Sequence, residues 1–331
     1  MHIPINTTPV TITAPSLLAD IGGTNARFVL QTSAGELLAL LVLPCNQYHT
    51  ISDALHAYLT DPTTIAHGGS TIRHAAIAIA NPVEGDTISM TNHHWTFSID
   101  ALRQEFQLET LQVVNDFTAL AMSLPYLLPH QRQQFGGGTK KDHGVIGLIG
   151  AGTGLGVSGL IPAQGRWIPL ESEGGHVTFA ASNQREADII NYVRHSHPHV
   201  SAERLLSGIG LDLVYSALAE RAGVEAQAFS VPEIVRQGLA KSCPVCEETL
   251  HAFCEMLATV ASNLALTLGA KGGIYIGGGI VPRLGEFFIH SGFRQRFEQK
   301  GRLSAYLETI PTYVITTEFP AFIGLSALLR D

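Results

Sequence analysis

Two glycine-rich turns in the sequence have the composition of phosphate-binding loops. The first is the segment DIGGT, which begins at Asp20, and the second is GAGTG, which begins at Gly150; each follows a short apolar run. Glycines allow backbone N–H groups to crowd against a phosphate, and a threonine adds a hydroxyl donor. Ordinary hairpins would explain the two turns separately, whereas together they could hold one phosphate chain from two sides. The sequence has no G-x-x-x-x-G-K-[ST] motif and no G-x-G-x-x-G that leads into a helix, which argues against P-loop and Rossmann-type binding.

Carboxylates lie where they could act on a bound phosphate or on a hydroxyl. Asp20 ends an apolar run, where an unpaired carboxylate would be unfavourable, and it could hold a water of the Mg²⁺ that accompanies a nucleotide. Asp116 follows Asn115 at the point where a predicted strand gives way to a helix. An aspartate there is commonly a helix N-cap, but it could instead take the proton of a substrate hydroxyl as a general base. Sequence order alone does not choose between these two roles.

A second polar group consists of Glu173, His176 and Glu203. The first two lie in one short segment, ESEGGHV, and the third lies at the expected start of a helix, in SAERLLSG. Carboxylates and an imidazole that converge could bind the several hydroxyls of a neutral polyol. A metal site is the rival interpretation, but E-x-x-H has neither the H-E-x-x-H spacing nor a companion cluster. Because a single loop histidine is ordinarily solvated, the prediction depends on the three residues acting together.

Two further motifs are ambiguous. The glycines that open GGGIVPR, Gly277 to Gly279, would let a flat group such as adenine approach the backbone, and a tight strand-to-helix turn would explain them nearly as well. Cys243 and Cys246 have C-x-x-C spacing without a second C-x-x-C or a histidine pair, so a structural zinc site is not predicted. No thioredoxin-like βαβ pattern surrounds them, so a redox role is not predicted either.

Short apolar, β-branched runs that alternate with helical stretches connect these motifs. The apolar runs predict strands at 17–21, 27–31, 37–43, 75–80, 111–114, 145–149, 155–161 and 274–276. The clearest helix is 249–268, which has the i, i+3, i+4, i+7 apolar spacing, and Gly269 is expected to end it. The stretch DFTALAMSL is expected to be a helix with Phe117, Leu120 and Leu124 on one face. Two such series, each opening on a glycine-rich turn, predict two α/β lobes with a ligand site in the cleft between them.

Composition restricts the class of protein. The chain has 331 residues, 45% hydrophobic and 15% charged, which is enough for two domains with their own cores. Its formal net charge is −8 and it has no basic block, which argues against nucleic acid or an anionic membrane as the main partner. No apolar run approaches the length of a spanning helix, and no Lys or Arg precedes Arg27, so neither a transmembrane segment nor a signal peptide is expected. We therefore expect a soluble, cytoplasmic protein in which residues 1–16 form a loose lead-in.

Taken together, the motifs resemble those of the bacterial glucokinase family, ATP-dependent hexose kinases of the actin/hexokinase/Hsp70 superfamily. The matching strings are DIGGTNAR, MTNHHW, NDFTA, GAGTGLGV, EGGHV, SAERLLSG and GGIVPR, in that family's order, and they cover nearly the whole chain. The resemblance implies a two-lobed α/β fold of the ribonuclease H-like, actin/hexokinase type. It implies a small lobe of residues 1–126 with 317–331 and a large lobe of residues 127–316. Glucose and ATP as substrates come from this resemblance and not from the spacing of the residues.

The resemblance also implies roles for individual residues. The residues that it implies for ATP are Asp20, Gly22, Gly23, Thr24, Gly150, Thr153, Gly154, Gly277, Gly278 and Gly279. Those that it implies for the sugar are Asn115, Asp116, Glu173, His176 and Glu203, with Asp116 as the catalytic base. Asp20 is expected to hold Mg²⁺ through water while the γ-phosphoryl of MgATP passes to the 6-hydroxyl of glucose. A homodimer is usual for such enzymes.

The sequence also departs from the family's pattern and leaves alternatives open. Ser172 stands where the family often has a glycine, and the Cys-rich zinc motif of the related repressor/ORF/kinase group is absent, so no structural zinc is expected. A kinase for mannose, fructose or an N-acetylated amino sugar is the alternative among enzymes. A sugar-sensing regulator or an actin-like ATPase switch would keep the fold without kinase chemistry. A DNA-binding repressor would need a helix-turn-helix module and a basic patch, for which the sequence has no pattern.

Overall fold

The computed structural model describes residues 14–91 and 93–330. The chain divides into two compact units, a smaller one of Met1–Leu127 with Glu318–Asp331 and a larger one of Leu128–Thr317. Most of the predicted lead-in, residues 1–13, lies outside the described residues, and Ser16 already begins the first strand. No helix in the described ranges is both long enough and apolar enough to cross a membrane.

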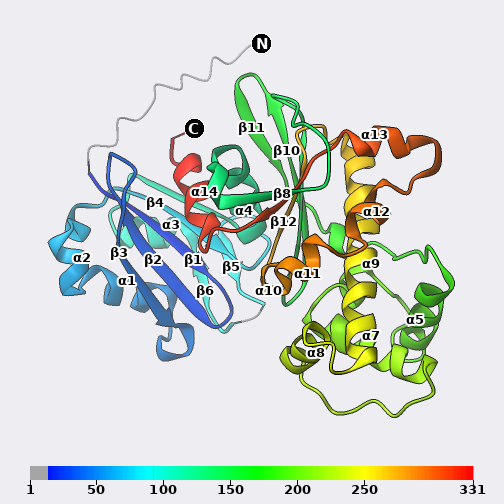
Figure 1. The fold of residues 1–331 in the computed structure, drawn as a ribbon. Coiled ribbons are helices and arrows are strands. Elements are labelled where there is room, and N and C mark those ends of the chain that lie inside the picture. The colour runs from blue at the N-terminus through cyan, green and yellow to red at the C-terminus, as the bar shows by residue number, and fades with distance from the viewer. Residues whose placement is uncertain (1–13, 92, 331) are drawn as a thin grey trace. The chain divides into compact units, whose positions relative to one another are not determined.

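The smaller unit is built on a five-stranded sheet (Figure 1). Its strands are β1 (Ser16–Ile21), β2 (Asn25–Gln31), β3 (Leu37–Pro44), β4 (His74–Ile79), β5 (Thr87–Ser89), β6 (Thr96–Ser98) and β7 (Thr110–Asn115). Its helices are α1 (Ile51–Leu59), α2 (Pro62–Ala66), α3 (Ile99–Glu105), α4 (Asp116–Ser123) and α14 (Pro320–Leu328). The large sheet has the order β3-β2-β1-β4-β7, and β5 and β6 form a separate pair. Since β1, β4 and β7 are parallel, their carboxyl ends meet at one edge.

Side chains that alternate along β1 enter two apolar layers, one on each face of this sheet. Leu17 and Ala19 belong to a cluster that includes residues of α1, whereas Leu18 packs with Phe322 and Leu325 of α14. Helices α4 and α14 lie against each other, and both contact β4 (Figure 1). Helix α14 is therefore part of the core to which β1 belongs.

The contact between α4 and α14 is close enough to require glycine at position 324. A Cβ at Gly324 would lie 1.8 Å from the carbonyl oxygen of Ala119, a backbone atom that cannot rotate away. We expect Gly324→Ala to force the two helices apart and to destabilise the protein by about 1–3 kcal/mol or more, measured by thermal and urea unfolding. Gly137→Ala is the matched control, because its Cβ would meet its nearest neighbour, the Glu308 carbonyl oxygen, at an ordinary 3.7 Å. Equal unfolding midpoints for the two variants would contradict the prediction.

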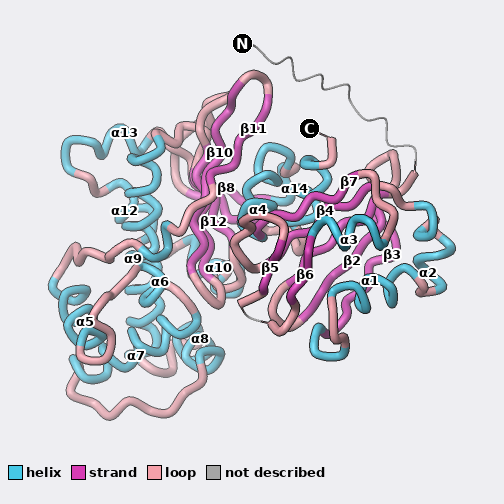
Figure 2. The backbone as a smooth tube through the Cα atoms, turned by 180° about the vertical axis from the view of Figure 1, so that it is seen from behind, coloured by secondary structure: helices cyan, strands magenta, loops and turns pink. Residues whose placement is uncertain are grey.

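The larger unit is built on a six-stranded sheet of order β11-β10-β9-β12-β13-β8. Its strands are β8 (Arg132–Phe135), β9 (Ile146–Ala151), β10 (Leu155–Ala163), β11 (Arg166–Leu170), β12 (Ile274–Gly277) and β13 (Thr312–Ile315). Its helices are α5 (Gln184–Arg194), α6 (Ala202–Leu205), α7 (Gly208–Arg221), α8 (Val231–Leu239), α9 (Pro244–Leu268), α10 (Val281–Leu284), α11 (Glu286–Ile289), α12 (Phe293–Glu298) and α13 (Ser304–Glu308). Helix α9 packs on β9 and extends into a group of helices that includes α7 and α8 (Figure 2).

Helix α9 is longer than the sequence predicts. Its end is as expected, because Gly269 has the left-handed φ of 62° that commonly stops a helix. Its start lies at Pro244 and not at residue 249, with Cys243 as the N-cap. Proline suits the first turn of a helix because that position needs no backbone donor. The apolar periodicity misses this turn because Glu247 and Glu248 interrupt it.

Candidate functional site

Polar residues lie at or just beyond the carboxyl end of each of the three parallel strands of the smaller unit. Asp20 lies next to the end of β1, Asn81 follows β4, Asn115 ends β7, and Asp116 begins α4. The parallel registers of β1 with β4 and of β4 with β7 bring these residues to one edge of the sheet. Ligands of α/β sheets bind outside such carboxyl ends. The smaller unit thus gathers its predicted site residues in one place.

The first glycine-rich turn is the turn of the β1–β2 hairpin. The Gly22 N–H donates to the Asn25 carbonyl at 3.0 Å, and the Cys45 N–H donates to the Thr24 carbonyl at 2.9 Å. These bonds fix the turn to the end of β3, while Thr24 itself is exposed. The hairpin interpretation is therefore correct for the backbone. Phosphate binding by the turn stays a prediction.

Asp20 is paired across this hairpin. Arg27 Nη1 donates to Asp20 Oδ2 at 3.1 Å from the directly opposed position on β2. Burial raises the pKa of Asp20, and the Arg27 charge partly offsets that effect. The carboxylate suits Mg²⁺, which commonly takes one or two carboxylates and completes its shell with water and phosphate oxygens. Within the described ranges, no group of three or more His, Cys, Asp or Glu side chains could hold a metal ion, so phosphate and water would have to supply most of the ligands here.

The N-cap of α4 is Asn115 and not Asp116. Asn115 Oδ1 accepts the N–H groups of Phe117 at 2.9 Å and Thr118 at 3.4 Å, and its Nδ2 donates to the Asn81 carbonyl at 3.2 Å. Asp116 occupies the first helical position, where its Oδ1 accepts the Phe117 N–H at 2.8 Å. The structure thereby removes the capping role that the sequence left open for Asp116. It also shows that much of the hydrogen-bonding capacity of Asn115 is used within the protein.

The surroundings of Asp116 raise its pKa, which makes its carboxylate a stronger base. Burial raises its pKa from the ordinary 3.8 to about 6, and the nearby negative charge of Asp20 adds to the rise, against the hydrogen bond from Phe117. A carboxylate with such a pKa is ionised at neutral pH and is more basic than an ordinary aspartate. Perturbed carboxyl groups of this kind are common at functional sites.

The three predicted polyol-binding residues lie together in the larger unit. His176 Nε2 is 3.6 Å from Glu173 Oε2, and His176 Nδ1 is 3.9 Å from Glu203 Oε1. The side chain of Glu173 is 74% exposed, that of His176 58% and that of Glu203 33%. These three residues, Glu173, His176 and Glu203, are called the polar row below. The row is open to a ligand, and Glu203 is its most enclosed member. A sequence separation of 27 residues between His176 and Glu203 conceals this contact.

Two glycines allow the carboxylate of Glu203 to contact the backbone next to the β9–β10 turn. Glu203 belongs to α6, which Ser201 caps, and its Oε2 accepts the Leu155 N–H at 2.9 Å. A Cβ at Gly154 would lie 2.4 Å from that same Oε2, and a Cβ at Gly175 would lie 2.0 Å from the Leu155 carbonyl oxygen. The second glycine-rich turn thus makes room for the carboxylate as well as turning the chain.

The second and third glycine-rich turns lie at the same edge of the larger unit's sheet. Strands β9 and β12 are parallel, with Gly150 beside Gly277. Gly278 has a φ of 79°, and a Cβ there would lie 2.3 Å from the carbonyl oxygen of Ala151. The Gly152 N–H donates to the Gly154 carbonyl at 2.8 Å across the β9–β10 turn. Backbone groups are therefore packed closely here, as both the turn and the ligand interpretations of Gly277 to Gly279 require.

A cavity of about 510 Å³ opens beside Thr153, a size typical of small-molecule sites. The residues that line it are Thr153, Gly208, Ile209, Asp212, Phe229, Ser230 and Val231. Of these, only Thr153 is a predicted site residue, and Gly208 ends the SAERLLSG motif. The others come from the beginnings of α7 and α8 and from the loop between these helices, and no motif marks them.

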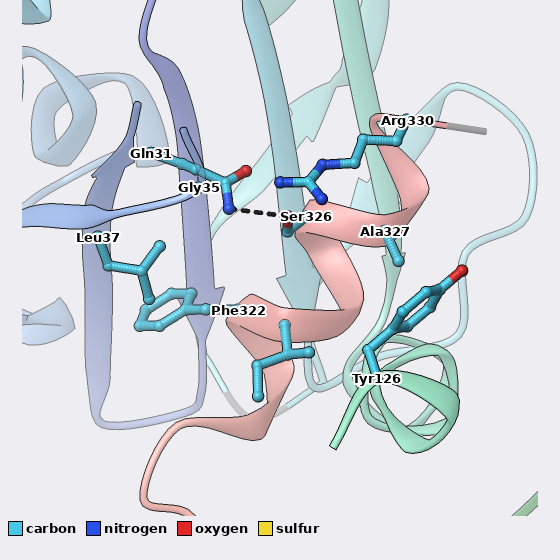
Figure 3. Close-up of a pocket in the computed structure, with 9 residues that line it drawn as sticks. Gln31, Gly35, Leu37, Tyr126, Phe322, Ser326, Ala327 and Arg330 are labelled. Atoms are coloured by element: carbon cyan, nitrogen blue, oxygen red, sulfur yellow. Dashed lines mark hydrogen bonds between the residues drawn. The ribbon is translucent and has the colours of Figure 1, made fainter. Parts of the chain in front are cut away.

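A smaller cavity of about 210 Å³ lies in the smaller unit, between β2, the start of β3 and α14 (Figure 3). Gln31 Nε2 donates to Ser326 Oγ at 2.7 Å inside it (Figure 3). Gln31 pairs with Ser16 at the start of β1, whereas Asp20 lies near the end of that strand. This cavity is therefore at the opposite end of the hairpin from the predicted phosphate turn, and no predicted site residue lines it.

Comparison with known proteins identifies the family. A family model described as Glucokinase matches residues 17–331. The chain belongs to the glucokinase family. This confirms the resemblance seen in the motifs, which begin and end within the matched residues.

Individual members of the glucokinase family are similar over most of the chain. A bifunctional protein named glk from Paraburkholderia xenovorans is 54% identical over 319 residues, which are 96% of this chain and 49% of that protein. The chain thus spans about half the length of the first curated relatives that it matches. A glucokinase from Chromobacterium violaceum is 50% identical over 317 residues, which are 96% of this chain and 90% of that protein.

A solved structure of a glucokinase from an Antarctic psychrotroph has the same fold. Its TM-score is 0.87 at 36% identity, over 95% of this chain and 98% of that chain. The two α/β lobes, each built on a sheet, confirm the predicted fold class of the actin/hexokinase type.

Proposed function

We propose that the chain is an ATP-dependent glucokinase, which transfers the γ-phosphoryl group of MgATP to the 6-hydroxyl of glucose and releases glucose 6-phosphate and ADP. One observation carries the proposal beyond family membership. Glu203 contacts His176 with one oxygen and accepts the Leu155 N–H with the other, directly after the GAGTG turn. A single carboxylate therefore joins the candidate sugar residues to the candidate phosphate loop.

In this proposal the polar row binds the ring hydroxyls of the sugar. Glu173 and Glu203 accept hydrogen bonds from hydroxyl groups, His176 donates or accepts according to its tautomer, and Asn115 contributes its amide. A site built to hydrogen-bond hydroxyls rejects analogues that lack one, because its polar groups are then left unpaired. This supports a hexose over a less hydroxylated substrate.

The glycine-rich turns are proposed to hold ATP. Backbone N–H groups of the two turns at Gly22 to Thr24 and Gly150 to Gly154 would bind the phosphates. The cavity beside Thr153 would take the adenosine, since Phe229 offers an apolar surface to the base and Asp212 an acceptor to the ribose hydroxyls. Asp20 would hold Mg²⁺ through water, and the ion, when bound, would neutralise charge on the phosphates.

Asp116 is proposed to take the proton of the 6-hydroxyl as the new O–P bond forms. Phosphoryl transfer requires little covalent chemistry from the protein, so positioning of the hydroxyl and neutralisation of charge account for most of the catalysis. The raised pKa of Asp116 supports this role, because proton transfer is most efficient when the pKa of the base is near the working pH.

The pH dependence of the reaction follows from this pKa. Asp116 is protonated below its pKa of about 6 and then cannot accept a proton. We expect kcat/KM for glucose to be level above about pH 7 and to fall about tenfold per unit of pH below 6. Initial rates between pH 5 and 8 at constant ionic strength measure it. A profile that stays level down to pH 5 would contradict the role of Asp116.

Sugar-dependent release of ADP from MgATP, measured by a coupled assay across a panel of hexoses, tests the proposal as a whole. Turnover selective for glucose is the expected result. Turnover selective for mannose, fructose or an N-acetylated amino sugar would agree with the proposed mechanism and contradict glucose as the substrate. Release of ADP without sugar would favour an ATPase switch. A homodimer and a cytoplasmic location are also part of the proposal, and light scattering and cell fractionation test them.

A further inference from the structure

Two cysteines lie within the first turn of α9. Cys243 is the N-cap, and its Sγ accepts the N–H of Cys246 at 3.5 Å. The N-cap and the third helical residue are one turn apart, which places their Cα atoms roughly 5 Å from each other by helix geometry. A disulfide spans Cα separations of about 4.4–6.8 Å. The backbone therefore already holds the two cysteines at a distance that a disulfide can bridge.

The two thiols differ in access and in acidity. Both are free in the structure; Cys243 is partly exposed and Cys246 is buried. Burial, with a further contribution from Cys243, raises the pKa of Cys246 to about 12. A reagent in solution would therefore meet Cys243 first, with Cys246 behind it as the second thiol. This order is the one that thiol–disulfide exchange uses in redox-active C-x-x-C pairs.

The cysteine pair is packed against the wall of the cavity beside Thr153. Cys246 forms a small cluster with Tyr215 and Ile234, against which Cys243 and Phe229 also pack. The Tyr215 and Phe229 ring centroids are 5.9 Å apart. Phe229 in turn lines the cavity. Phe229 therefore belongs both to the surroundings of the cysteines and to the wall of the cavity.

The same cluster anchors the loop between α7 and α8. The Gln227 N–H donates to the Tyr215 hydroxyl at 3.1 Å, just before Phe229 and Ser230 enter the cavity wall. A change in the position of Cys246 would therefore act on both attachments of this loop, the hydrogen bond and the ring contact.

We propose that Cys243 and Cys246 form a reversible disulfide by exchange with a small-molecule disulfide, and that this bond weakens nucleotide binding in the cavity beside Thr153. The Cys243 thiolate attacks one sulfur of the small disulfide and releases the other half as a thiolate, which takes up a proton. Cys246 gives its proton to a thiolate of the small molecule, and its sulfur attacks the Cys243 sulfur and releases the second half, which is protonated by water. The two cysteines lose two electrons in total, and the small disulfide is reduced to two thiols.

Bond formation changes the first turn of α9. The Cys243 sulfur leaves the Cys246 N–H that it accepts in the thiol form, and Cys246 turns away from its packing with Tyr215. Phe229 then loses part of its support. The formation of the disulfide stands independently, whereas its effect on ATP rests on the proposed function.

Treatment of the whole protein with oxidised glutathione, followed by digestion and mass spectrometry, tests the chemical step. The wild type is expected to yield a 243–246 disulfide that dithiothreitol reverses. Cys246→Ser is expected to trap one glutathione on Cys243, and Cys243→Ser to form neither product. Cys254→Ala, which removes a fully buried thiol from the same helix, is the matched control and should behave as wild type. A wild type that stays reduced, or a Cys243→Ser variant that traps glutathione on Cys246, would overturn the proposal.

Equilibrium binding of MgADP to the reduced and oxidised forms tests the coupling. We expect the Kd of the oxidised wild type to rise by at least ~5-fold and that of Cys243→Ser to stay unchanged by oxidant. Equal Kd values for the two forms of the wild type would overturn the coupling. A protein that forms the disulfide and binds MgADP but phosphorylates no hexose would contradict the proposed function alone.

Discussion

Asp116→Asn is expected to lower kcat by at least ~10² while glucose still binds, because positioned base catalysis typically contributes about 10²–10⁴ in rate. Asparagine keeps the shape of the side chain and an oxygen for the Phe117 N–H, which Asp116 accepts at 2.8 Å. It cannot take a proton from the 6-hydroxyl. Steady-state kinetics give kcat, and calorimetric titration with glucose gives the Kd. Asp100→Asn removes the same charge at an exposed position and should leave both constants unchanged.

Although Asp116→Asn is expected to lower kcat, it is expected to raise the stability of the folded protein. Since the pKa of Asp116 is raised from 3.8 to about 6, the folded state binds a proton more tightly than the unfolded state. Stability therefore falls as pH rises from about 4 to 6, and the ionised carboxylate destabilises the fold at pH 7. We expect Asp116→Asn to be more stable than wild type at pH 7 by about 1–3 kcal/mol, measured by urea unfolding. Near-normal turnover of the variant would contradict the base assignment, and unchanged stability would contradict the raised pKa.

Glu203→Ala is expected to raise the Kd for glucose by roughly 10- to 10²-fold, since a hydrogen bond to a charged group contributes roughly 1.5–3 kcal/mol. The variant loses any hydroxyl contact of Glu203, and it also leaves the Leu155 N–H without the acceptor it has at 2.9 Å. We therefore expect kcat to fall as well. Calorimetric titration with glucose in the absence of nucleotide separates the binding effect from turnover.

Two further variants show which function of Glu203 matters. Glu203→Gln keeps an oxygen for the Leu155 N–H and loses only the charge, so its Kd should lie between those of wild type and Glu203→Ala. Glu220→Ala, at an exposed position near the end of α7, is the matched control and should bind glucose as wild type does. If Glu203→Ala binds glucose normally, Glu203 is a support for the β9–β10 turn and not a sugar ligand.

The strands that sequence could predict are those with long apolar runs. All eight predicted strands are present, and their ends differ by a few residues. Strands β5, β6, β8, β11 and β13 are three to five residues long and were not predicted; β12 is equally short, and its apolar run was recognised beside the glycines that follow it. Runs as short as RQQF in β8 contain no periodicity, and pairing with a neighbouring strand decides their conformation.

Side-chain environments were harder to predict than elements. The helix after Asp116 is present; of its predicted face, Leu124 is fully buried, whereas Phe117 and Leu120 are half-buried. Ala119, which the sequence does not single out, is fully buried because Gly324 brings α14 close to it. Nothing in the sequence near Ala119 indicates a contact with a helix some 200 residues away.

In the candidate site, too, the sequence indicated the residues that belong to motifs and not those that reach the site from elsewhere. The motifs located Glu173, His176 and Glu203, and the structure brings the three together. Asn81 was missed, although an asparagine before proline at the end of the buried run AAIAIA was a signal for a polar turn. Phe229 could not have been found, since it enters the cavity wall from a loop without any motif.

The packing of α14 in the smaller unit affects the order in which the two units can fold during synthesis. Strand β1 and helix α4 are synthesised before the whole of Leu128–Thr317, and α14 follows only after it. During that time the apolar face that includes Leu18 and Ala119 lacks the cover that Phe322 and Leu325 later provide. The larger unit is continuous in sequence and can fold as it emerges. The smaller unit is thus begun before the larger unit and completed after it, and its unfinished face is where we expect a chaperone to bind the nascent chain.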